Sequence, residues 1–387
     1  MTQSRRRLIL LGATGSIGTS TIDLVRRDPE RFEIVAMTAN RRREGLATLA
    51  GEFGEAWLQL GDPAAHESLR SEGFGPRMLA PGHEGLVEAL ERFPDALVVN
   101  GLVGAAGLEP TVTALERGHD VALANKEALV VGGPLVRDAA RHGGARIWPV
   151  DSEHSAIAQC LRGNPPEEVA RLWLTASGGP FRDRDPETLA GVTLEEVLNH
   201  PTWDMGPKIT VDSASMMNKG LEVLEAHFLF DVPIERIGVV IHRESIVHSM
   251  IELRDGAFLA QMGAPDMRIP ILYALSEGVH EACDVAPWSP LEAPTLHFEA
   301  PDPRKYPCLD LARRAGEAGG AAPIVLNAAN EVAVAAVLRG ALPFVGIPSV
   351  IERALESLPL DAVADVESAL ERDRRTREHA EAALRTH

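Results

Sequence analysis

The feature that most limits how this chain can fold is an apolar run, a glycine-rich segment and a helix-forming stretch in direct succession. Residues 8–11 (LILL) predict a fully buried strand, and residues 12–18 (GATGSIG) follow it at once. Apolar side chains then recur at helical spacing as far as Val25, and residues 32–37 predict a second strand. This succession predicts a strand–helix–strand unit, from which parallel sheets are built.

The same alternation continues beyond this unit. Further buried strands are expected at residues 96–100 and 120–124, with a crossover helix at residues 111–117 between them. Strands that alternate with helices indicate a doubly wound parallel sheet. We therefore predict that residues 1–150 form a Rossmann-like, nucleotide-binding α/β domain, a length within the usual range for one domain.

The rest of the chain divides by its composition. Residues 151–285 combine short strands with loops rich in Gly, Pro and His, and predict an α+β catalytic domain. Prolines recur through residues 286–308, which predicts an extended linker because proline ends helices and central strands. Residues 309–387 are rich in Ala, Leu, Glu and Arg at helical spacing, and predict a C-terminal helical bundle.

Charge and cysteine content exclude several classes of protein. A formal net charge of −18 argues against nucleic acid or an anionic membrane as the main partner, since both require a basic face. Cys160, Cys283 and Cys308 lack CxxC spacing, so neither a disulfide framework nor a zinc–thiolate site is predicted. No apolar stretch has the length of a signal peptide core or of the ~20 residues of a membrane helix. We expect a soluble protein of the cytoplasm, with no membrane partner.

The glycine-rich segment predicts a dinucleotide site, because glycines let the backbone approach a pyrophosphate at a helix amino terminus. An ordinary glycine-rich turn is the alternative. NAD sites place an acidic residue after the second strand, but here residues 40–43 read Asn-Arg-Arg-Arg. Guanidinium groups can pair with a 2′-phosphate, so the preferred cofactor is NADPH unless these arginines form only a solvated basic turn.

Three carboxylates predict a site for one hard divalent cation. Asp151 and Glu153 follow a short apolar segment, and in an extended chain both side chains point the same way, which causes repulsion unless a cation lies between them. Glu222 shares the polar face of a predicted helix with Asn218 and Lys219. Carboxylates without cysteine or paired histidine select Mg²⁺ or Mn²⁺. The alternatives are an exposed acidic pair and an ordinary amphipathic surface helix.

A second anion site is predicted at residues 177–179 (SGG), which end the expected strand at residues 171–176. A serine hydroxyl and free amides at such a turn form the kind of concavity that receives a phosphate. With Ser213, Asn218 and Lys219 the turn can neutralise a substrate dianion in an otherwise acidic protein. A plain turn is the alternative.

Taken together, these motifs resemble the 1-deoxy-D-xylulose 5-phosphate reductoisomerase family. The resemblance rests on the glycine-rich segment, on residues 124–127 (ANKE), 151–154 (DSEH) and 175–181 (TASGGPF), and on the block 199–222. It continues through residues 326–331 (LNAANE). The matching segments span nearly the whole chain in one order, and the block at residues 199–222 is highly specific.

The resemblance implies NADPH-dependent conversion of 1-deoxy-D-xylulose 5-phosphate, a small phosphorylated keto-sugar, to 2-C-methyl-D-erythritol 4-phosphate in the non-mevalonate isoprenoid pathway. It also implies a homodimer. The implied metal ligands are Asp151, Glu153 and Glu222. The implied catalytic residues, the last of them on a mobile flap, are Lys126, Glu153, His200 and Trp203. The implied substrate-binding residues are Lys126, Ser152, Glu153, Ser177, His200, Ser213, Asn218, Lys219 and Glu222.

The implied NADPH site draws on both ends of the predicted nucleotide-binding domain and on the specific block. Its residues are Thr14, Gly15, Ser16, Ile17, Asn40, Arg41, Arg42, Asn125, Glu127 and Gly206. At residues 40–42 the chain departs from similar proteins, which usually have Gly, a basic residue and Asn there. The departure affects the adenosine end of the site and not the reacting end.

Two other functions stay open on the sequence alone. Another NADP-dependent Rossmann oxidoreductase, such as a semialdehyde dehydrogenase, needs a catalytic Cys or a Lys–Asp pair, and the cysteines here have no activating neighbour motif. A non-enzymatic NADPH-sensing regulator would keep the fold and bind the dinucleotide without turnover. The complete set of carboxylates counts against this regulator.

Overall fold

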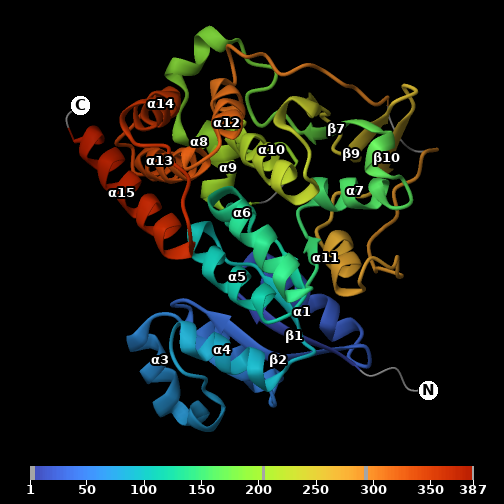
Figure 1. Cartoon of the computed structure of the whole chain (residues 1–387), viewed down its shortest axis with the longest axis vertical. Helices are drawn as coiled ribbons and strands as arrows, with labels where there is room; N and C mark the ends of the chain where they lie inside the picture. Colours follow the sequence, from blue (N-terminus) through green and yellow to red (C-terminus); the bar gives the residue numbers. More distant parts are fainter. Residues whose placement is uncertain (1–4, 203–204, 292–294, 386–387) are drawn as a thin grey trace. The chain divides into compact units, whose positions relative to one another are not determined.

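The computed structural model describes residues 5–202, 205–291 and 295–385, which pack as two compact units (Figure 1). Unit 1 comprises the described residues of Met1–Ala128, Leu135–Ser155 and Asp266–Val285. Unit 2 comprises those of Leu129–Pro134, Ala156–Pro265 and Ala286–His387. Both units are therefore assembled from separate stretches of chain.

Unit 1 is built on a six-stranded parallel sheet with the order β3-β2-β1-β4-β5-β6. Its strands are β1 (Arg6–Leu11), β2 (Phe32–Ala39), β3 (Trp57–Leu60), β4 (Leu97–Asn100), β5 (Val121–Leu123) and β6 (Ile147–Pro149). The chain starts in the middle of the sheet and builds outward to β3 before it returns to β4. In such sheets a ligand crevice forms at the carboxyl edge where the order reverses, here between β1 and β4.

Helices cover this sheet because each carries an apolar face. They are α1 (Ser16–Arg27), α2 (Arg43–Glu52), α3 (Pro63–Leu69), α4 (His83–Arg92), α5 (Leu108–Glu116), α6 (Lys126–Gly143) and α11 (Arg268–Leu275). The middle of α6, Leu129–Pro134, belongs to unit 2. Ile22 and Val25 of α1 are buried against the sheet, in one apolar core with Leu8 and Leu10 of β1. The predicted Rossmann-like α/β fold is confirmed.

One helix of unit 1 comes from far along the chain. Helix α11 packs against α1, β5 and β6, and its residues Ile271 and Leu275 belong to the apolar core of the parallel sheet. We predicted residues 266–285 as part of the catalytic domain, and the structure instead packs them with the nucleotide-binding fold. The apolar face of α11 finds its partner there and not in the neighbouring sequence.

Unit 2 is built on a four-stranded mixed sheet with the order β10-β9-β7-β8, in which only β7 and β8 run parallel. Its strands are β7 (Val169–Ala176), β8 (Ile237–Ile241), β9 (Val247–Leu253) and β10 (Phe258–Met262). Its helices are α8 (Leu194–Leu198), α9 (Pro207–Ala214), α10 (Met217–Phe230), α12 (Pro307–Ala318), α13 (Ala322–Leu338), α14 (Ile347–Ser357) and α15 (Val366–Leu384). Helix α7 (Ser152–Leu161) begins in unit 1 and continues in unit 2.

The C-terminal helices and the mixed sheet share one apolar core. Leu172 of β7, Leu221 of α10, Leu311 of α12 and Val325 of α13 all belong to it. Helix α10 contacts β7 and β8 as well as α12, so it lies between the sheet and the C-terminal helices. The sequence predicted a separate helical bundle at residues 309–387, but the described helices of that region pack in unit 2 because α10 and the sheet cover their apolar faces.

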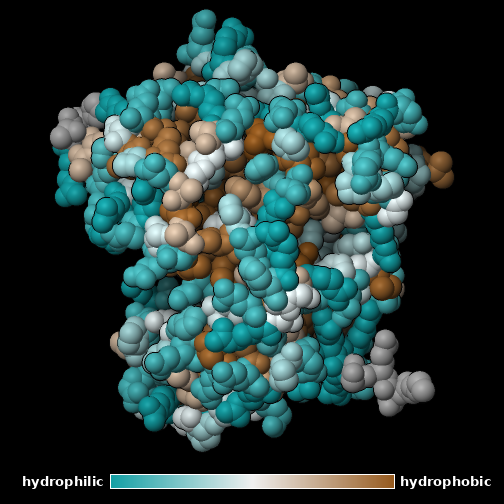
Figure 2. Space-filling model, in the orientation of Figure 1, coloured by the Kyte–Doolittle hydropathy of each residue, from teal (hydrophilic) through white to brown (hydrophobic). Residues whose placement is uncertain are grey.

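The last helix, α15, is held partly by ion pairs. Arg377 of α15 pairs with Asp373 of the same helix and, at 2.7 Å, with Glu331 of α13. In Figure 2 the surface of α15 is mostly hydrophilic, as its exposed arginines and glutamates require. Among the described residues, no helix combines the length and apolar character needed to cross a membrane.

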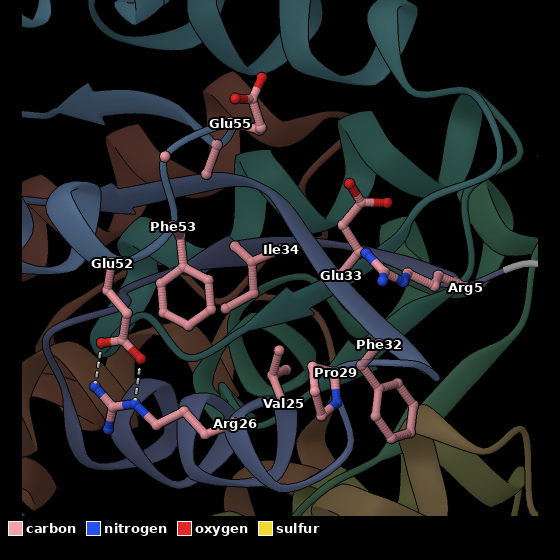
Figure 3. Close-up of a pocket in the computed structure, with 12 residues that line it drawn as sticks. Arg5, Val25, Arg26, Pro29, Phe32, Glu33, Ile34, Glu52, Phe53 and Glu55 are labelled. Carbon is pink, nitrogen blue, oxygen red and sulfur yellow. Dashed lines mark hydrogen bonds and ion pairs between the residues drawn. The ribbon is translucent and has the colours of Figure 1, made fainter.

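Unit 1 also has a hollow of about 400 Å³, formed where α1 and α2 end and β2 begins (Figure 3). Arg26 of α1 and Glu52 of α2 form a two-fold hydrogen-bonded ion pair at its margin, with both distances 2.6 Å. The Arg26 guanidinium holds the pKa of Glu52 below its ordinary value. The hollow lies at the amino end of β2, so it is at the opposite sheet edge from the glycine-rich segment.

The tight turn before α1 makes a testable demand on Gly18. A β-carbon at this position would lie 2.5 Å from the carbonyl oxygens of both Gly12 and Ala13, too close for any side chain. We expect Gly18→Ala to lower the free energy of unfolding by about 1–3 kcal/mol. Gly51 of α2 is the matched control, since nothing lies within 4 Å of a β-carbon there. Gly51→Ala should stabilise the helix by about 0.5–1 kcal/mol. Urea unfolding of both variants measures these values, and equal effects would contradict the turn geometry.

Candidate active site

The glycine-rich segment lies between β1 and α1, at the point where the sheet order reverses. Gly12 has a φ of +84°, and a β-carbon there would lie 2.8 Å from the Gly101 carbonyl oxygen at the end of β4. Gly15 is the N-cap of α1, so the amides of Ser16 and Ile17 begin the first helical turn. The segment therefore has the close backbone approach and the helix amino terminus that a pyrophosphate requires.

The arginines after β2 differ in their surroundings. Arg42 donates from Nη1 to the Thr14 carbonyl oxygen at 2.9 Å, which brings the end of β2 against the glycine-rich segment. The Arg41 side chain is 81% exposed and lies 3.3 Å from Asp62, whereas Arg43 is held in an ion pair with Glu72. Arg41 and Arg42 are thus the two exposed guanidinium groups at the predicted adenosine end. Asn40, between them and β2, is also exposed.

Asn125 fixes the connections that follow β4 and β5. Its side-chain nitrogen donates to the carbonyl oxygens of Leu102 and Gly104, both at 3.0 Å, and its side-chain oxygen accepts from the Ala128 amide and caps α6. The same nitrogen lies 3.2 Å from a Glu127 carboxylate oxygen. Both amide hydrogens of the Asn125 side chain are therefore used by groups of the protein. Asn125 contributes to the crevice by holding the loops after β4 and β5 in place.

Lys126, Asp151, Ser152 and Glu153 lie at two helix starts in unit 1. The Lys126 ammonium, at the start of α6, is 2.6 Å from an Asp151 carboxylate oxygen, and both side chains are about 15% exposed. The Ser152 hydroxyl donates to Glu153 at 2.6 Å. We expected Asp151 and Glu153 to lie in an extended segment. This was wrong, because Glu153 lies in the first turn of α7. There the helix dipole stabilises its negative charge.

The carboxylate on α10 is buried with its neighbours. Lys219 is 3% exposed and Glu222 is 1% exposed, and the two form an ion pair. Asn218 donates to the second Glu222 oxygen at 2.6 Å. Met217 and Leu221 are also fully buried, so α10 is enclosed all round. The alternative of an amphipathic surface helix is therefore wrong, and buried charges of this kind are kept only when they are paired.

The turn after β7 brings three predicted phosphate-binding residues of unit 2 together. Gly178 and Gly179 have φ of +80° and +65°, and a β-carbon on Gly179 would lie 2.8 Å from the Ser213 carbonyl oxygen. The Ser177 hydroxyl oxygen is 3.0 Å from His200 Nε2. The Thr202 amide donates to His200 Nδ1, so the ring proton is on Nε2 and points at Ser177. The serine hydroxyl hydrogen is then left to bind an anion.

The pKa of His200, beside this turn, is lower than that of an ordinary histidine. Burial, with the positive charge of Arg182 as a smaller cause, lowers the pKa of His200 to about 4. The imidazole is therefore neutral at neutral pH in the free protein. A bound phosphate dianion would favour the protonated ring, so the site can take up a proton with its ligand.

Sequence reasoning missed a group of interacting polar side chains next to Ser213, formed by Lys208, Asp212 and Asn330. Asp212 is 1% exposed, accepts from the Asn330 amide at 2.8 Å and lies 2.9 Å from the Lys208 ammonium. Asn330 belongs to the LNAANE motif, which we quoted without a role. The i to i+4 spacing of Lys208 and Asp212 on α9 could have revealed the pair. No local signal could have revealed Asn330, which lies 118 residues away.

Two predicted residues lie on the segment before α9. Gly206 is the exposed N-cap of α9, which begins at Pro207. Trp203, predicted to lie on a mobile flap, is outside the described residues. Of the three predicted metal ligands, Asp151 and Glu153 belong to unit 1 and Glu222 belongs to unit 2.

Models of one protein family match most of the chain. A family model described as 1-deoxy-D-xylulose 5-phosphate reductoisomerase matches residues 8–133. Two models of the C-terminal domain of that enzyme match residues 147–230 and 262–379. The chain belongs to the 1-deoxy-D-xylulose 5-phosphate reductoisomerase family. The family predicted from the sequence motifs is thus confirmed.

Reductoisomerases of this family resemble the chain over its full length. The protein of Geobacillus sp. (strain WCH70) is 48% identical over 97% of this chain and 99% of its own, and that of Bacillus subtilis (strain 168) is 44% identical over 98% and 100%. A crystal structure of the enzyme with NADPH, fosmidomycin and magnesium has a TM-score of 0.93 at 39% identity, covering 98% of both chains. The Zymomonas mobilis enzyme with NADPH has a TM-score of 0.91 at 40% identity, covering 98% and 99%.

The lowered pKa of His200 has a consequence for stability. Between its ordinary value of 6.5 and about 4 the folded protein binds fewer protons at this ring than the unfolded chain, so His200 makes stability fall as the pH drops through this range. We expect His200→Gln, which keeps a side-chain donor, to flatten that fall. Urea denaturation at pH values from 7 to 4 tests this prediction. Parallel curves for the two proteins would show that His200 is not neutral in the folded state.

Proposed function

We propose that this protein uses NADPH and a divalent cation to rearrange and reduce 1-deoxy-D-xylulose 5-phosphate to 2-C-methyl-D-erythritol 4-phosphate, within isoprenoid synthesis. The observation that carries the proposal is the agreement of family and geometry. The family match covers nearly the whole chain, and the predicted dinucleotide segment and phosphate turn have the local structures those ligands need. As a member of this family, the chain is an NADPH-dependent oxidoreductase.

Unit 2 binds the phosphate end of the substrate in this proposal. The Ser177 hydroxyl, the neighbouring His200 and Ser213 surround one turn, and Asn218 and Lys219 follow on α10. Binding of the phosphate, which is remote from the reacting carbons, then orients those carbons. Its binding energy offsets the entropy cost of holding them in the reactive arrangement. No residue has to act as a covalent nucleophile.

Asp151, Glu153 and Glu222 hold the divalent cation in this proposal. These residues fit a divalent cation because each offers carboxylate oxygens. Asp151 and Glu222 each already form an ion pair with a lysine ammonium group. A bound cation supplies Lewis acidity to the keto and hydroxyl oxygens of the substrate. Lys126 and Ser152, beside these carboxylates, then contact the hydroxyl-bearing part of the substrate.

NADPH binds along the carboxyl edge of the parallel sheet in this proposal. Thr14, Gly15, Ser16 and Ile17 receive the pyrophosphate, with Asn40, Arg41 and Arg42 at the adenosine 2′-phosphate. The remaining predicted cofactor contacts are Asn125, Glu127 and Gly206.

The cysteines argue against a thiol-dependent dehydrogenase on the same fold. Burial raises the pKa of Cys160 to about 11 and the pKa of Cys308 to about 12, so neither is a thiolate at neutral pH. Cys283 also has a raised pKa, chiefly through burial. All three are free thiols, which supports the cytoplasm as the proposed compartment.

The reaction is tested by following NADPH absorbance with 1-deoxy-D-xylulose 5-phosphate, with and without Mg²⁺ or Mn²⁺. We expect turnover that requires the cation. Glu222→Gln should lower turnover by roughly 100-fold and leave NADPH binding nearly unchanged, because it removes a charged metal ligand and keeps the side-chain shape. The exposed Glu235 on the same unit provides the control Glu235→Gln, which should retain full activity. A fully active, cation-dependent Glu222→Gln enzyme would remove Glu222 from the metal site.

We also propose that the protein is a homodimer, associated through the outer strand of the mixed sheet. Strand β10 is an edge strand, and its apolar side chains Phe258, Leu259 and Met262 are 51%, 38% and 37% exposed. An exposed apolar edge is a ready site for association, and a second copy of the chain would cover it.

The dimer is tested by light scattering coupled to size-exclusion chromatography. Phe258→Glu places a charge on the proposed interface, and we expect it to shift the protein from dimer to monomer. Val279, 48% exposed on unit 1, provides the control Val279→Glu, which should stay dimeric. A monomeric wild-type protein, or a Phe258→Glu variant as dimeric as the control, would rule out this interface.

A further inference from the structure

Side chains hold the backbone carbonyl groups around the phosphate turn, and two of the donors, Lys305 and Tyr306, come from far along the chain. The Gly178 carbonyl oxygen accepts from the Tyr306 hydroxyl at 2.9 Å. The Ser177 carbonyl oxygen accepts from Arg182 Nη1 at 3.1 Å, and the Arg182 carbonyl oxygen accepts from the Lys305 ammonium at 2.7 Å. Three carbonyl groups of this short segment are therefore already satisfied.

Tyr306 comes from the end of the proline-rich connection, 128 residues beyond the turn. It is the N-cap residue of α12 and is 2% exposed, which makes it one of the largest fully buried side chains of the protein. Burial raises the pKa of its phenol above the ordinary value. The hydroxyl is therefore protonated at neutral pH and can donate to the Gly178 carbonyl.

The connection that carries Tyr306 is itself fixed to the mixed sheet. Glu299 pairs with Ile241 of β8 through two backbone hydrogen bonds of 2.8 and 2.9 Å. The ring nitrogen Nδ1 of the buried His242 lies 2.9 Å from the His297 carbonyl oxygen. Tyr306 thus reaches the turn from an anchored segment, and its position is set by the strand that runs beside β7.

The turn needs such anchoring because of its two glycines. Gly178 and Gly179 both adopt positive φ, which glycine allows, but a Gly-Gly pair also has more conformational freedom to lose than any other pair. With its carbonyl groups fixed from behind, the turn keeps its amides and the Ser177 hydroxyl in one arrangement. A pre-arranged set of donors binds an anion more tightly than a set that must first be ordered.

We propose that Tyr306 is a positioning residue for substrate binding, which holds the Ser177–Gly178–Gly179 turn in its phosphate-binding shape through the Gly178 carbonyl. It acts through the turn and has no contact with the reacting atoms. Residues 297–306 of the proline-rich connection then contribute to substrate binding as well as linking sheet and helices. This inference rests on the proposed function, because it assigns the turn to the substrate phosphate.

The test is Tyr306→Phe, which removes one hydroxyl and keeps the ring. Because the turn is loosened only where the phosphate binds, we expect the KM for 1-deoxy-D-xylulose 5-phosphate to rise about fivefold to tenfold, as expected for one lost hydrogen bond. The inhibition constant of inorganic phosphate, used as a probe of the same turn, should rise by the same factor. The kcat and the KM for NADPH should stay within about twofold of wild type.

Tyr273 is the other tyrosine of the chain and provides the matched control. It is buried in unit 1, and Tyr273→Phe should leave both phosphate-dependent constants unchanged. An unchanged KM and phosphate inhibition constant in Tyr306→Phe would overturn the inference, as would an equal loss of NADPH affinity, which indicates general loosening. If Tyr306→Phe does not fold, Lys305→Met removes the donor to the Arg182 carbonyl and is judged by the same constants. A wild-type protein inactive on the substrate would instead refute the proposed function.

Discussion

The buried ion pair between Lys219 and Glu222 constrains how α10 packs in unit 2. Two charges inside a protein are tolerated only when they face each other and their remaining polar groups are satisfied, as Asn218 does here for Glu222. Helix α10 is enclosed by the mixed sheet and by α12, and a β-carbon on Gly220 would lie 2.6 Å from the Ala312 β-carbon. This close packing keeps water away from the pair. Electrostatic interactions between these groups and a ligand are stronger there, because the effective dielectric constant is low.

The sequence predicted those parts of the fold whose signal is local. The apolar runs of β1 and β4 are fully buried, and the helical spacing in residues 309–387 predicted a helical region in which α13, α14 and α15 form. Domain limits could not be predicted in the same way, because an apolar helix face does not specify its partner. Helix α11 joins the parallel sheet and α12 joins α10, although each lies next to other elements in the sequence.

The candidate site followed the same division between local and distant information. Residue types and spacing indicated the glycine-rich segment, the arginines after β2 and the phosphate turn, because each is one continuous stretch. The pattern misjudged Glu153, whose place in the first turn of α7 depends on where that helix begins. It gave no sign of Asn330 or Tyr306, which support Asp212 and Gly178 across 118 and 128 residues. Contacts over such separations depend on the fold and leave no periodicity to read.

The discontinuity of unit 1 has a consequence for how the protein is made. Its parallel sheet is complete in sequence at β6, but one of the helices that covers β5 and β6 is α11 (Arg268–Leu275). A nascent chain that has emerged only as far as Pro149 must leave that apolar surface bare while more than a hundred further residues are translated. Synthesis at the ribosome therefore exposes the sheet to chaperones, or to aggregation, until the missing helix arrives.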